Sequence, residues 1–259
     1  MKDLVLVKLG GSLITDKSKP YTPRLDVIKR LAREIHAARE KNDIKIIIGH
    51  GGGSFPHLPA KKFQTHKGLR GPQSYRGLAI VQDAAARLNR IIVAALLNAG
   101  ENAISIQPSA SCLAMDDEIM EWYTKPLEMV LKYDMIPVVY GDVGLDMEKG
   151  CCILSTEELL SYLARRLGSN RIIMCGKMNG VVINGETMRE VRPKDFPVIK
   201  NDLLGSDGID VTGGMDLKVR KALNLAKQGI ESEIINGFEA GYLERSLMGE
   251  RDLGTRILC

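Results

Sequence analysis

Aromatic residues are scarce in this chain: they make up 5% of its 259 residues, with a single tryptophan. Proteins that hold single-stranded nucleic acids stack bases on aromatic side chains, so this composition disfavours nucleic-acid binding. No apolar run approaches the roughly 20 residues that a membrane-spanning helix needs. The first residues also lack the charged and apolar regions of a secretory signal. We therefore expect a cytoplasmic protein with no nucleic-acid and no membrane partner.

Cysteines are few and irregularly placed. There are five, an odd number, and none has the C-x-x-C spacing of zinc sites and redox motifs. This pattern argues against a zinc site and against the disulfide framework of a small secreted protein, and we assign no metal-ligating residues. The formal net charge is only +4, from 36 basic and 32 acidic side chains. The motifs G-x-x-x-x-G-K-[ST], H-R-D and D-F-G are absent, which excludes P-loop NTPases and protein kinases.

Short apolar runs that alternate with helical patterns make up most of the chain. The strand candidates cover residues 4–7, 44–48, 103–106, 136–140, 171–175 and 233–235. Apolar residues recur every three to four positions, as in amphipathic helices, at 27–38, 74–98, 127–132, 157–167 and 215–228. This alternation predicts an α/β protein with a mostly parallel sheet that helices cover on both faces. An Asn-Gly pair at 184–185 predicts a β-hairpin over 181–186.

Glycines stand where the predicted strands end or where a helix is about to begin. They are Gly10-Gly11, Gly51-Gly52-Gly53, Gly141, Gly176 and Gly213-Gly214. In open parallel sheets, ligands bind outside the carboxyl ends of the strands. A glycine turn lets the backbone approach a phosphate, and the helix that follows presents free N–H groups to it. One such turn is ordinary in any α/β protein, but five of them indicate a phosphate-binding edge.

Several segments resemble a known family. Lys8-Leu9-Gly10-Gly11-Ser12, residues 49–55 (GHGGGSF) and residues 210–215 (DVTGGM) resemble the amino acid kinase superfamily. His57, which follows the glycine triple, and residues 15–17, 106–109, 139–142 and 254–256 are similar to its isopentenyl phosphate kinase branch. The resemblance covers essentially the whole chain, with the motifs in the right order.

This resemblance implies a fold, an activity and partners. The fold it implies is an open αβα sandwich with a mostly parallel central sheet. Residues 1–168 would form the N-terminal lobe, which holds the phosphoryl acceptor, and residues 169–259 the C-terminal lobe, which holds ATP, within one continuous fold. The implied activity is phosphorylation of isopentenyl phosphate with ATP and Mg²⁺, by a homodimer.

The same resemblance assigns roles to residues of this chain. The expected catalytic residues are Lys8, Lys17, His57 and Glu157, with Lys17 stabilising the transition state. The expected nucleotide-binding residues are Lys8, Gly10, Gly11, Ser12, Gly53, Lys177, Gly214 and Lys218. The expected acceptor-binding residues are Gly52, His57 and Thr156. Lysines at glycine turns suit this chemistry, because phosphoryl transfer depends on positioning and on positive charge around the transferring oxygens.

The residues themselves favour a phosphate acceptor over an alcohol. A phosphomonoester has a second pKa of about 6 and is a dianion at neutral pH, so its oxygen attacks without a general base. The N-terminal loops contain no obvious catalytic aspartate. An apolar stripe over residues 78–97 is mostly core, and the resemblance implies that part of it, with Ile104 and Ile106, lines a pocket for a five-carbon chain. His50 is expected to be structural, at the end of its strand.

The sequence departs from the family's pattern in three places. Pro56 stands where the family has glycine, and proline fixes φ and removes an N–H donor. Residues 155–158 read Ser-Thr-Glu-Glu instead of Ser-Gly-Asp-Asp, and residues 176–180 read GKMNG instead of Thr-Asp-Val-Asp-Gly. These departures keep two alternatives open. One is a kinase of the same fold for another small phosphate or a carboxylate, and the other is a non-catalytic nucleotide-binding homologue.

Overall fold

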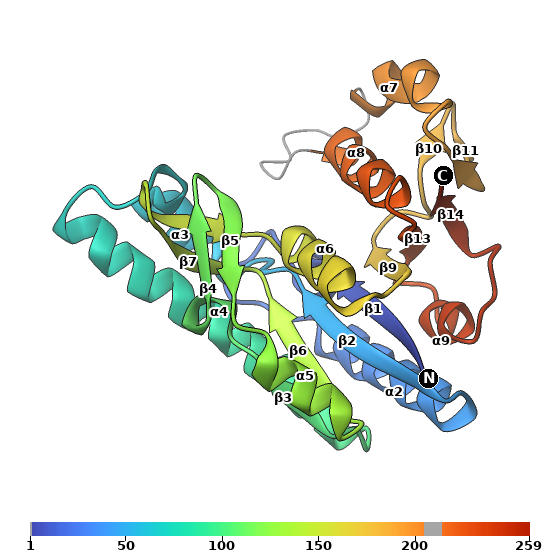
Figure 1. Cartoon of the computed structure of the whole chain (residues 1–259), viewed down its shortest axis with the longest axis horizontal. Helices are drawn as coiled ribbons and strands as arrows, with labels where there is room; N and C mark the ends of the chain where they lie inside the picture. Colours follow the sequence, from blue (N-terminus) through green and yellow to red (C-terminus); the bar gives the residue numbers. More distant parts are fainter. Residues whose placement is uncertain (1, 205–213) are drawn as a thin grey trace.

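The computed structural model describes residues 2–204 and 214–259, and its main feature is an eight-stranded sheet (Figure 1). The strands of this sheet are β1 (Asp3–Leu9), β2 (Ile44–His50), β3 (Ala103–Ser105), β6 (Ile136–Tyr140), β9 (Arg171–Gly176), β12 (Glu190–Val191), β13 (Glu231–Asn236) and β14 (Gly254–Ile257). They lie in the order β12-β14-β13-β9-β1-β2-β6-β3. All neighbours pair in parallel except β13 and β14. The predicted mostly parallel sheet is confirmed.

Helices cover both faces of this sheet, so the predicted αβα sandwich is also confirmed. One face packs against α2 (Leu25–Lys41), α4 (Pro72–Asn98) and α9 (Tyr242–Leu247). The other packs against α5 (Lys125–Lys132), α6 (Thr156–Leu167) and the end of α8 (Gly214–Ala226). The remaining described helices are α1 (Gly11–Ile14), α3 (His57–Phe63) and α7 (Phe196–Leu204), with 3₁₀ turns η1 (Thr65–Lys67) and η2 (Pro108–Ala110).

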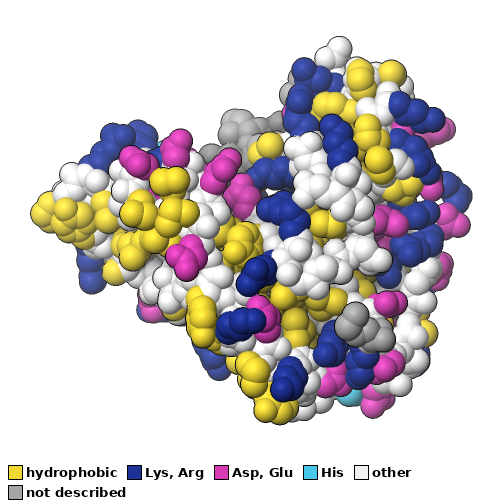
Figure 2. All heavy atoms as spheres, viewed as in Figure 1, with side chains coloured by type: hydrophobic (Ala, Val, Ile, Leu, Met, Phe, Trp, Pro, Cys, Tyr) yellow, Lys and Arg dark blue, Asp and Glu magenta, His cyan; other side chains and the backbone are white. Residues whose placement is uncertain are grey.

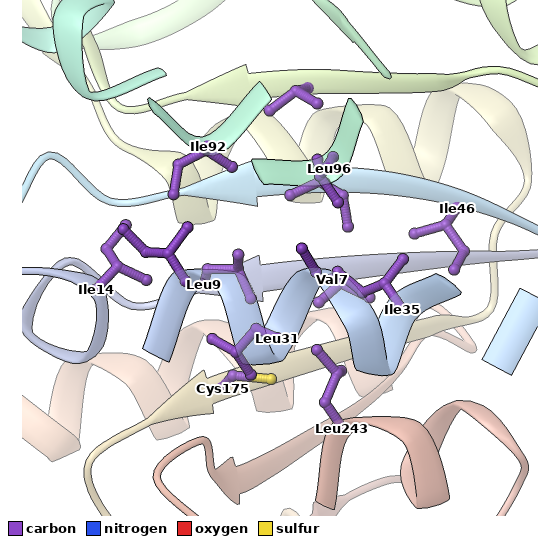
Figure 3. Packing of buried hydrophobic residues seen from close by; sticks show 14 of the residues in the cluster. Val7, Leu9, Ile14, Leu31, Ile35, Ile46, Ile92, Leu96, Cys175 and Leu243 are labelled. Carbon is purple, nitrogen blue, oxygen red and sulfur yellow. The ribbon is translucent and has the colours of Figure 1, made fainter. Parts of the chain in front are cut away.

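The alternation of side chains along the strands decides which residues meet which helices. In β1, Val5, Val7 and Leu9 belong to the core on the α2 and α4 face, whereas Leu6 belongs to the core under α6. Figure 3 shows Val7 and Leu9 packed between helices of the first face. Because side chains alternate with a period of two, Lys8 shares the α6 face with Leu6. By the same rule, His50 at the end of β2 shares the α4 face with the buried Ile46 and Ile48.

A smaller sheet extends the N-terminal part of the fold. Its strands are β4 (Cys112–Met115), β5 (Glu118–Trp122), β7 (Asp142–Asp146) and β8 (Gly150–Leu154), in the order β5-β4-β7-β8. The outer pairs are antiparallel and the inner pair, β4 and β7, is parallel. The sequence patterns do not predict this sheet.

The predicted hairpin near residue 184 is confirmed. It joins β10 (Val182–Ile183) to β11 (Glu186–Thr187), and both turn residues have positive φ, 52° at Asn184 and 84° at Gly185. Such φ values are those of a type I′ turn, which Asn-Gly favours. Even α4, with 27 residues, is not apolar enough to cross a membrane, and the same holds for every other described helix.

Candidate active site

Five adjacent strands of the large sheet, β13, β9, β1, β2 and β6, end at or just before glycines, all at the same edge. The sheet hydrogen bonding continues through these glycines: Gly10 N donates to Cys175 O (2.8 Å), Gly51 N to Leu9 O (2.9 Å), Gly141 N to His50 O (3.0 Å) and Gly237 N to Gly176 O (2.8 Å). The strand order reverses direction at β1, since the chain places β2 on one side of it and β9 on the other. Ligands of open α/β sheets bind at such a crossover, outside the carboxyl ends of the strands.

The glycines of the first two loops are required by close packing of one backbone on the other. A Cβ on Gly11 would lie 2.5 Å from Gly53 N, and a Cβ on Gly51 would lie 2.7 Å from Gly11 N. Gly53 has a φ of +55°, and a Cβ there would overlap Thr15 Oγ1. Thr15 fastens the two loops, because its hydroxyl donates to Gly11 O (2.7 Å) and accepts from Ser54 N (2.9 Å). The predicted nucleotide-binding residues Gly10, Gly11 and Gly53 therefore lie together.

Lys8 and Glu157 form an ion pair at this edge. Lys8 points to the α6 face of the sheet, and Glu157 lies in the first turn of α6, which Ser155 caps by accepting from Glu158 N at 3.2 Å. Their side chains are 13% and 23% exposed. Burial alone would raise the pKa of Glu157, but the charge and hydrogen bond of Lys8 outweigh it, and the charge of Lys218 adds to them. The pKa of Glu157 is therefore lowered, and this carboxylate is ionised between two lysines.

Lys218 reaches this place because α8 is held beside α6. Lys218 lies one turn after Gly214, the residue at which α8 begins, and it is half-buried. Lys221, one turn further along, pairs with Glu158 of α6 at 2.6 Å. Figure 2 shows Lys and Arg side chains over the middle of the molecule, where α6 and α8 lie. Residues 210–213 of the predicted nucleotide motif lie outside the described residues.

Lys17 and Lys177 are exposed on loops that leave the same edge. Lys17 follows Asp16, whose carboxylate accepts from the backbone N (3.0 Å) and hydroxyl (2.7 Å) of Ser18 and so shapes the turn. Lys177 follows β9 directly. Within residues 2–204 and 214–259, neither lysine forms an ion pair. Ser12 is half-buried in α1, where the first amides have no acceptor within the helix.

His57 lies beside the glycine triple. It is the first residue of α3, its side chain is exposed, and its ring carbon Cδ2 is 3.7 Å from the position that a Cβ on Gly52 would take. Pro56 is the N-cap of α3 with a φ of −80°, and its ring packs over Gly52. An N-cap residue donates no N–H to the helix, so proline is compatible with this position. The departure at Pro56 therefore leaves His57 next to Gly52.

Thr156 lies beneath the glycine loop. It is buried, and its hydroxyl donates to His50 O at 2.8 Å. A Cβ on Gly141 would be 3.0 Å from this hydroxyl, which places Thr156 between the ends of β2 and β6. A contact between Thr156 and an acceptor stays a prediction, since in this structure its hydroxyl is bonded to His50.

His50 is fully enclosed between the sheet and α4, as its expected structural role requires. Its Nδ1 is 3.2 Å from Gly51 O, its Nε2 is 3.2 Å from Nδ2 of Asn89, and its ring stacks on Tyr140 with centroids 5.6 Å apart. Burial lowers the pKa of His50 to about 4, although the bond to Gly51 opposes this effect. Sequence reasoning did not identify Asn89; the only signal is a polar residue within the apolar stripe of residues 78–97.

Comparisons with known proteins agree with this geometry. The model of the amino acid kinase family matches residues 3–236. The chain therefore belongs to the amino acid kinase family.

Within that family, the chain is similar to isopentenyl phosphate kinases. Those of Methanocaldococcus jannaschii and Methanothermobacter thermautotrophicus are 33% and 36% identical to it, with 98% of each chain covered. A solved structure of an isopentenyl phosphate kinase, 31% identical, superimposes with a TM-score of 0.83 over 98% of this chain and 99% of its own. The resemblance inferred from the sequence is confirmed.

Proposed function

We propose that this protein transfers the γ-phosphoryl group of ATP to isopentenyl phosphate, forming isopentenyl diphosphate and ADP. The observation that carries this proposal is the arrangement at the ends of β1 and β2. The Lys8–Glu157 pair lies on one side of the glycine loop and His57 on its flank. The full-length similarity to isopentenyl phosphate kinases supports the same reaction.

The carboxylates at this edge support a phosphate acceptor. An alcohol needs a base to remove its proton, whereas a phosphomonoester dianion does not. Glu157 forms an ion pair with Lys8. Asp142 is buried and accepts hydrogen bonds from the backbone N atoms of Ser109 (3.2 Å) and Val143 (2.8 Å). Burial raises the pKa of Asp142, although these hydrogen bonds oppose it. Neither carboxylate is available as a base, so we propose that the acceptor oxygen attacks unaided.

Each predicted site residue keeps its role in this proposal. Lys17 would neutralise the charge on the transferring phosphoryl group, and Lys8 and Lys218 would bridge the phosphates of the two substrates. The nucleotide would be held by Gly10, Gly11, Ser12, Gly53, Lys177 and Gly214, and the acceptor by Gly52, His57 and Thr156. Residues 1–168 would hold the acceptor and residues 169–259 the nucleotide, with Gly10, Gly11, Ser12 and Gly53 of the first lobe reaching the nucleotide phosphates across one shared sheet.

The cation, assembly and location complete the proposal. The described acids that come close enough together to hold a metal, Asp117 and Asp146 with Cys152, belong to the smaller sheet, and Asp146 already accepts four backbone N–H bonds. We therefore propose that Mg²⁺ arrives bound to the phosphates of ATP, where it screens their charge. A cytoplasmic homodimer is what the family resemblance supports.

The test is an ADP-release assay with Mg-ATP and a panel of acceptors: isopentenyl phosphate, acetylglutamate, aspartate and a nucleoside monophosphate. Isopentenyl phosphate should give the highest kcat/KM. Turnover of an amino acid but not of isopentenyl phosphate would refute the acceptor while leaving the family assignment intact. Binding of ATP by calorimetry without ADP release from any acceptor would identify a non-catalytic homologue.

A further inference from the structure

Asn89 is a buried amide within the apolar face of α4. It is 0% exposed, and its neighbours Leu88, Ile92 and Val93 belong to the core on that face. Burying an amide there is unfavourable unless its polar atoms are hydrogen-bonded. Its Nδ2 is within hydrogen-bond distance of His50 Nε2, but its Oδ1 is buried without a hydrogen-bond partner among the described residues. A half-satisfied buried amide lowers stability, which points to a role other than packing.

The contacts of His50 determine which of its nitrogens carries the proton. Nδ1 is 3.2 Å from Gly51 O, which only accepts, so Nδ1–H is the donor. Nε2 then holds a lone pair and accepts from Nδ2 of Asn89 at 3.2 Å. The amide of Asn89 therefore stabilises the one neutral tautomer of His50 that donates to Gly51.

That donation fixes a peptide unit of the glycine loop. In a planar trans peptide the C=O and N–H groups point in opposite directions. Holding the Gly51 carbonyl toward His50 therefore turns the N–H of Gly52 away from His50. Gly52 N lies beside the end of β6, 3.8 Å from the position that a Cβ on Gly141 would take, at the edge where the acceptor phosphate is proposed to bind.

The rest of His50 is held as firmly as its ring. Its carbonyl accepts from the Thr156 hydroxyl at 2.8 Å and from Gly141 N at 3.0 Å, and the ring stacks on Tyr140 at an interplanar angle of 13°. The ring therefore has one orientation: the Gly51 carbonyl requires the proton on Nδ1, and the donor on Asn89 satisfies the lone pair that remains on Nε2. Removing that donor leaves Nε2 without a partner and weakens the hold of the ring on the Gly51 carbonyl, without displacing the loop's other anchors.

We infer that Asn89 is a positioning residue: through His50 it orients the Gly51–Gly52 peptide so that the N–H of Gly52 is offered to the acceptor phosphate. This inference rests on the proposed function. Asn89 is 0% exposed and acts on the site through His50 and the Gly51–Gly52 peptide, so its effect is expected on the affinity for the acceptor and not on that for ATP.

Asn89→Leu tests the inference, because leucine removes the donor at nearly constant volume. We expect the KM for isopentenyl phosphate to rise about tenfold, as for loss of one hydrogen bond to a charged group. The KM for ATP should stay within about twofold. Tm should change little, because removal of the unpartnered Oδ1 of Asn89 offsets the hydrogen bond that Nε2 of His50 loses. Asn89→Gln, which keeps a donor, should recover part of the affinity.

Ile92→Val is the matched control on the same face of α4. Removal of one buried methylene should lower Tm by a few degrees and leave both KM values unchanged. If Ile92→Val weakens acceptor binding as much as Asn89→Leu does, the effect is general packing and the inference fails.

The ring tautomer gives an independent measurement. ¹⁵N NMR of the wild-type protein should show His50 neutral with its proton on Nδ1 and with the Nε2 resonance shifted by the hydrogen bond from Asn89. Asn89→Leu should abolish that shift of Nε2. A wild-type ring protonated on Nε2, or unchanged acceptor KM in Asn89→Leu, would overturn the inference. If the wild-type protein does not turn over isopentenyl phosphate, the proposed function fails, while the NMR result still decides the role of Asn89 toward His50.

Discussion

Lys8 at the end of β1 is paired with Glu157 in the first turn of α6, although 149 residues separate them in the chain. Two local rules bring them together. The strand alternation points Lys8 to the α6 face, and the Ser155 cap fixes where α6 begins. The acid therefore holds Lys8 in place at a strand end, where the proposed reaction needs a lysine that binds phosphate.

Replacing Glu157 by Gln should separate positioning from charge. Without the carboxylate, Lys8 and Lys218 lose their common anchor, so kcat should fall about tenfold to a hundredfold, the scale of a charged hydrogen bond. The KM for ATP should not rise, because the edge becomes more positive. Steady-state kinetics with varied ATP measures both. Glu158→Gln, whose partner Lys221 lies outside this pair, is the control and should stay near wild type; equal losses in both variants would contradict the role of Glu157.

Lys17→Ala should lower kcat about a hundredfold, as for removal of one transition-state contact, and leave the Kd for ATP unchanged by calorimetry. Lys17 lies in an exposed turn, so its removal should not affect Tm. Lys19→Ala, two residues away in the same exposed segment, gives a control with the same change of net charge. A Lys17→Ala enzyme with near wild-type kcat would remove this lysine from the mechanism.

Gly53→Ala should destabilise the protein strongly. Its φ is +55°, and a Cβ would overlap Thr15 Oγ1 and come within 2.7 Å of Gly11 O, which are parts of a tightly packed loop pair. Gly168→Ala is the matched control: its φ is +71°, but nothing lies within 4 Å of the added Cβ. The control should lose about 1–2 kcal/mol from the backbone conformation alone, and Gly53→Ala clearly more, in urea unfolding. Equal losses would mean that the loops separate easily.

His57 distinguishes the acceptor classes. If it donates to the oxygens of a phosphate acceptor, His57→Ala should lower kcat/KM for isopentenyl phosphate by about one to two orders of magnitude. His57→Gln keeps a donor and should lose less. Kinetics of both variants should show an unchanged KM for ATP. A His57→Ala enzyme with wild-type kcat/KM would exclude His57 from acceptor binding.

Much of the fold could be predicted from the sequence because its signals are local. Glycines after apolar runs mark strand ends, and period-two alternation assigns each strand residue to a face, which is how Lys8 and His50 come to point in opposite directions. The Asn184-Gly185 pair specifies its own turn. These features need no knowledge of distant residues.

The smaller sheet could not be predicted, because its strands are four or five residues long and its patterns are mixed. Met115 and Leu145 are exposed although apolar, whereas Asp146 is buried and paired with backbone N–H groups. Its register depends on contacts between β4 and β7, which are about 30 residues apart, and no local signal encodes them.

The contacts within the site could not be predicted from the sequence either. Sequence spacing does not say which residue of α4 faces His50, since that depends on how the helix is rotated on the sheet. Asn89 therefore reads only as one polar residue in an apolar stripe. Thr156 occupies the position of a family glycine, and the structure shows that its hydroxyl is bonded to His50 O, a contact that the motif alone does not indicate.

The buried His50 should make stability depend on pH in a defined direction. Its pKa is about 4 in the folded protein, against about 6.5 in an unfolded chain. Above pH 6.5 the ring is neutral in both states, so it adds no pH dependence. Below pH 6.5, His50 becomes protonated in the unfolded state but stays neutral in the folded state. The free energy of unfolding therefore falls as pH falls. This loss levels off below pH 4, where the ring is protonated in both states. Linkage gives a loss of about 2 kcal/mol between pH 7.5 and pH 5.

Urea unfolding at both pH values measures this loss. Comparison with His50→Asn isolates the contribution of the ring, since that variant lacks it and should lose about 2 kcal/mol less over the same interval. His66→Asn, at an exposed position, should keep the wild-type dependence. A His50→Asn variant with the same pH dependence as wild type would show that His50 is not held neutral, and the hydrogen-bond pattern that assigns its proton to Nδ1 would then be wrong.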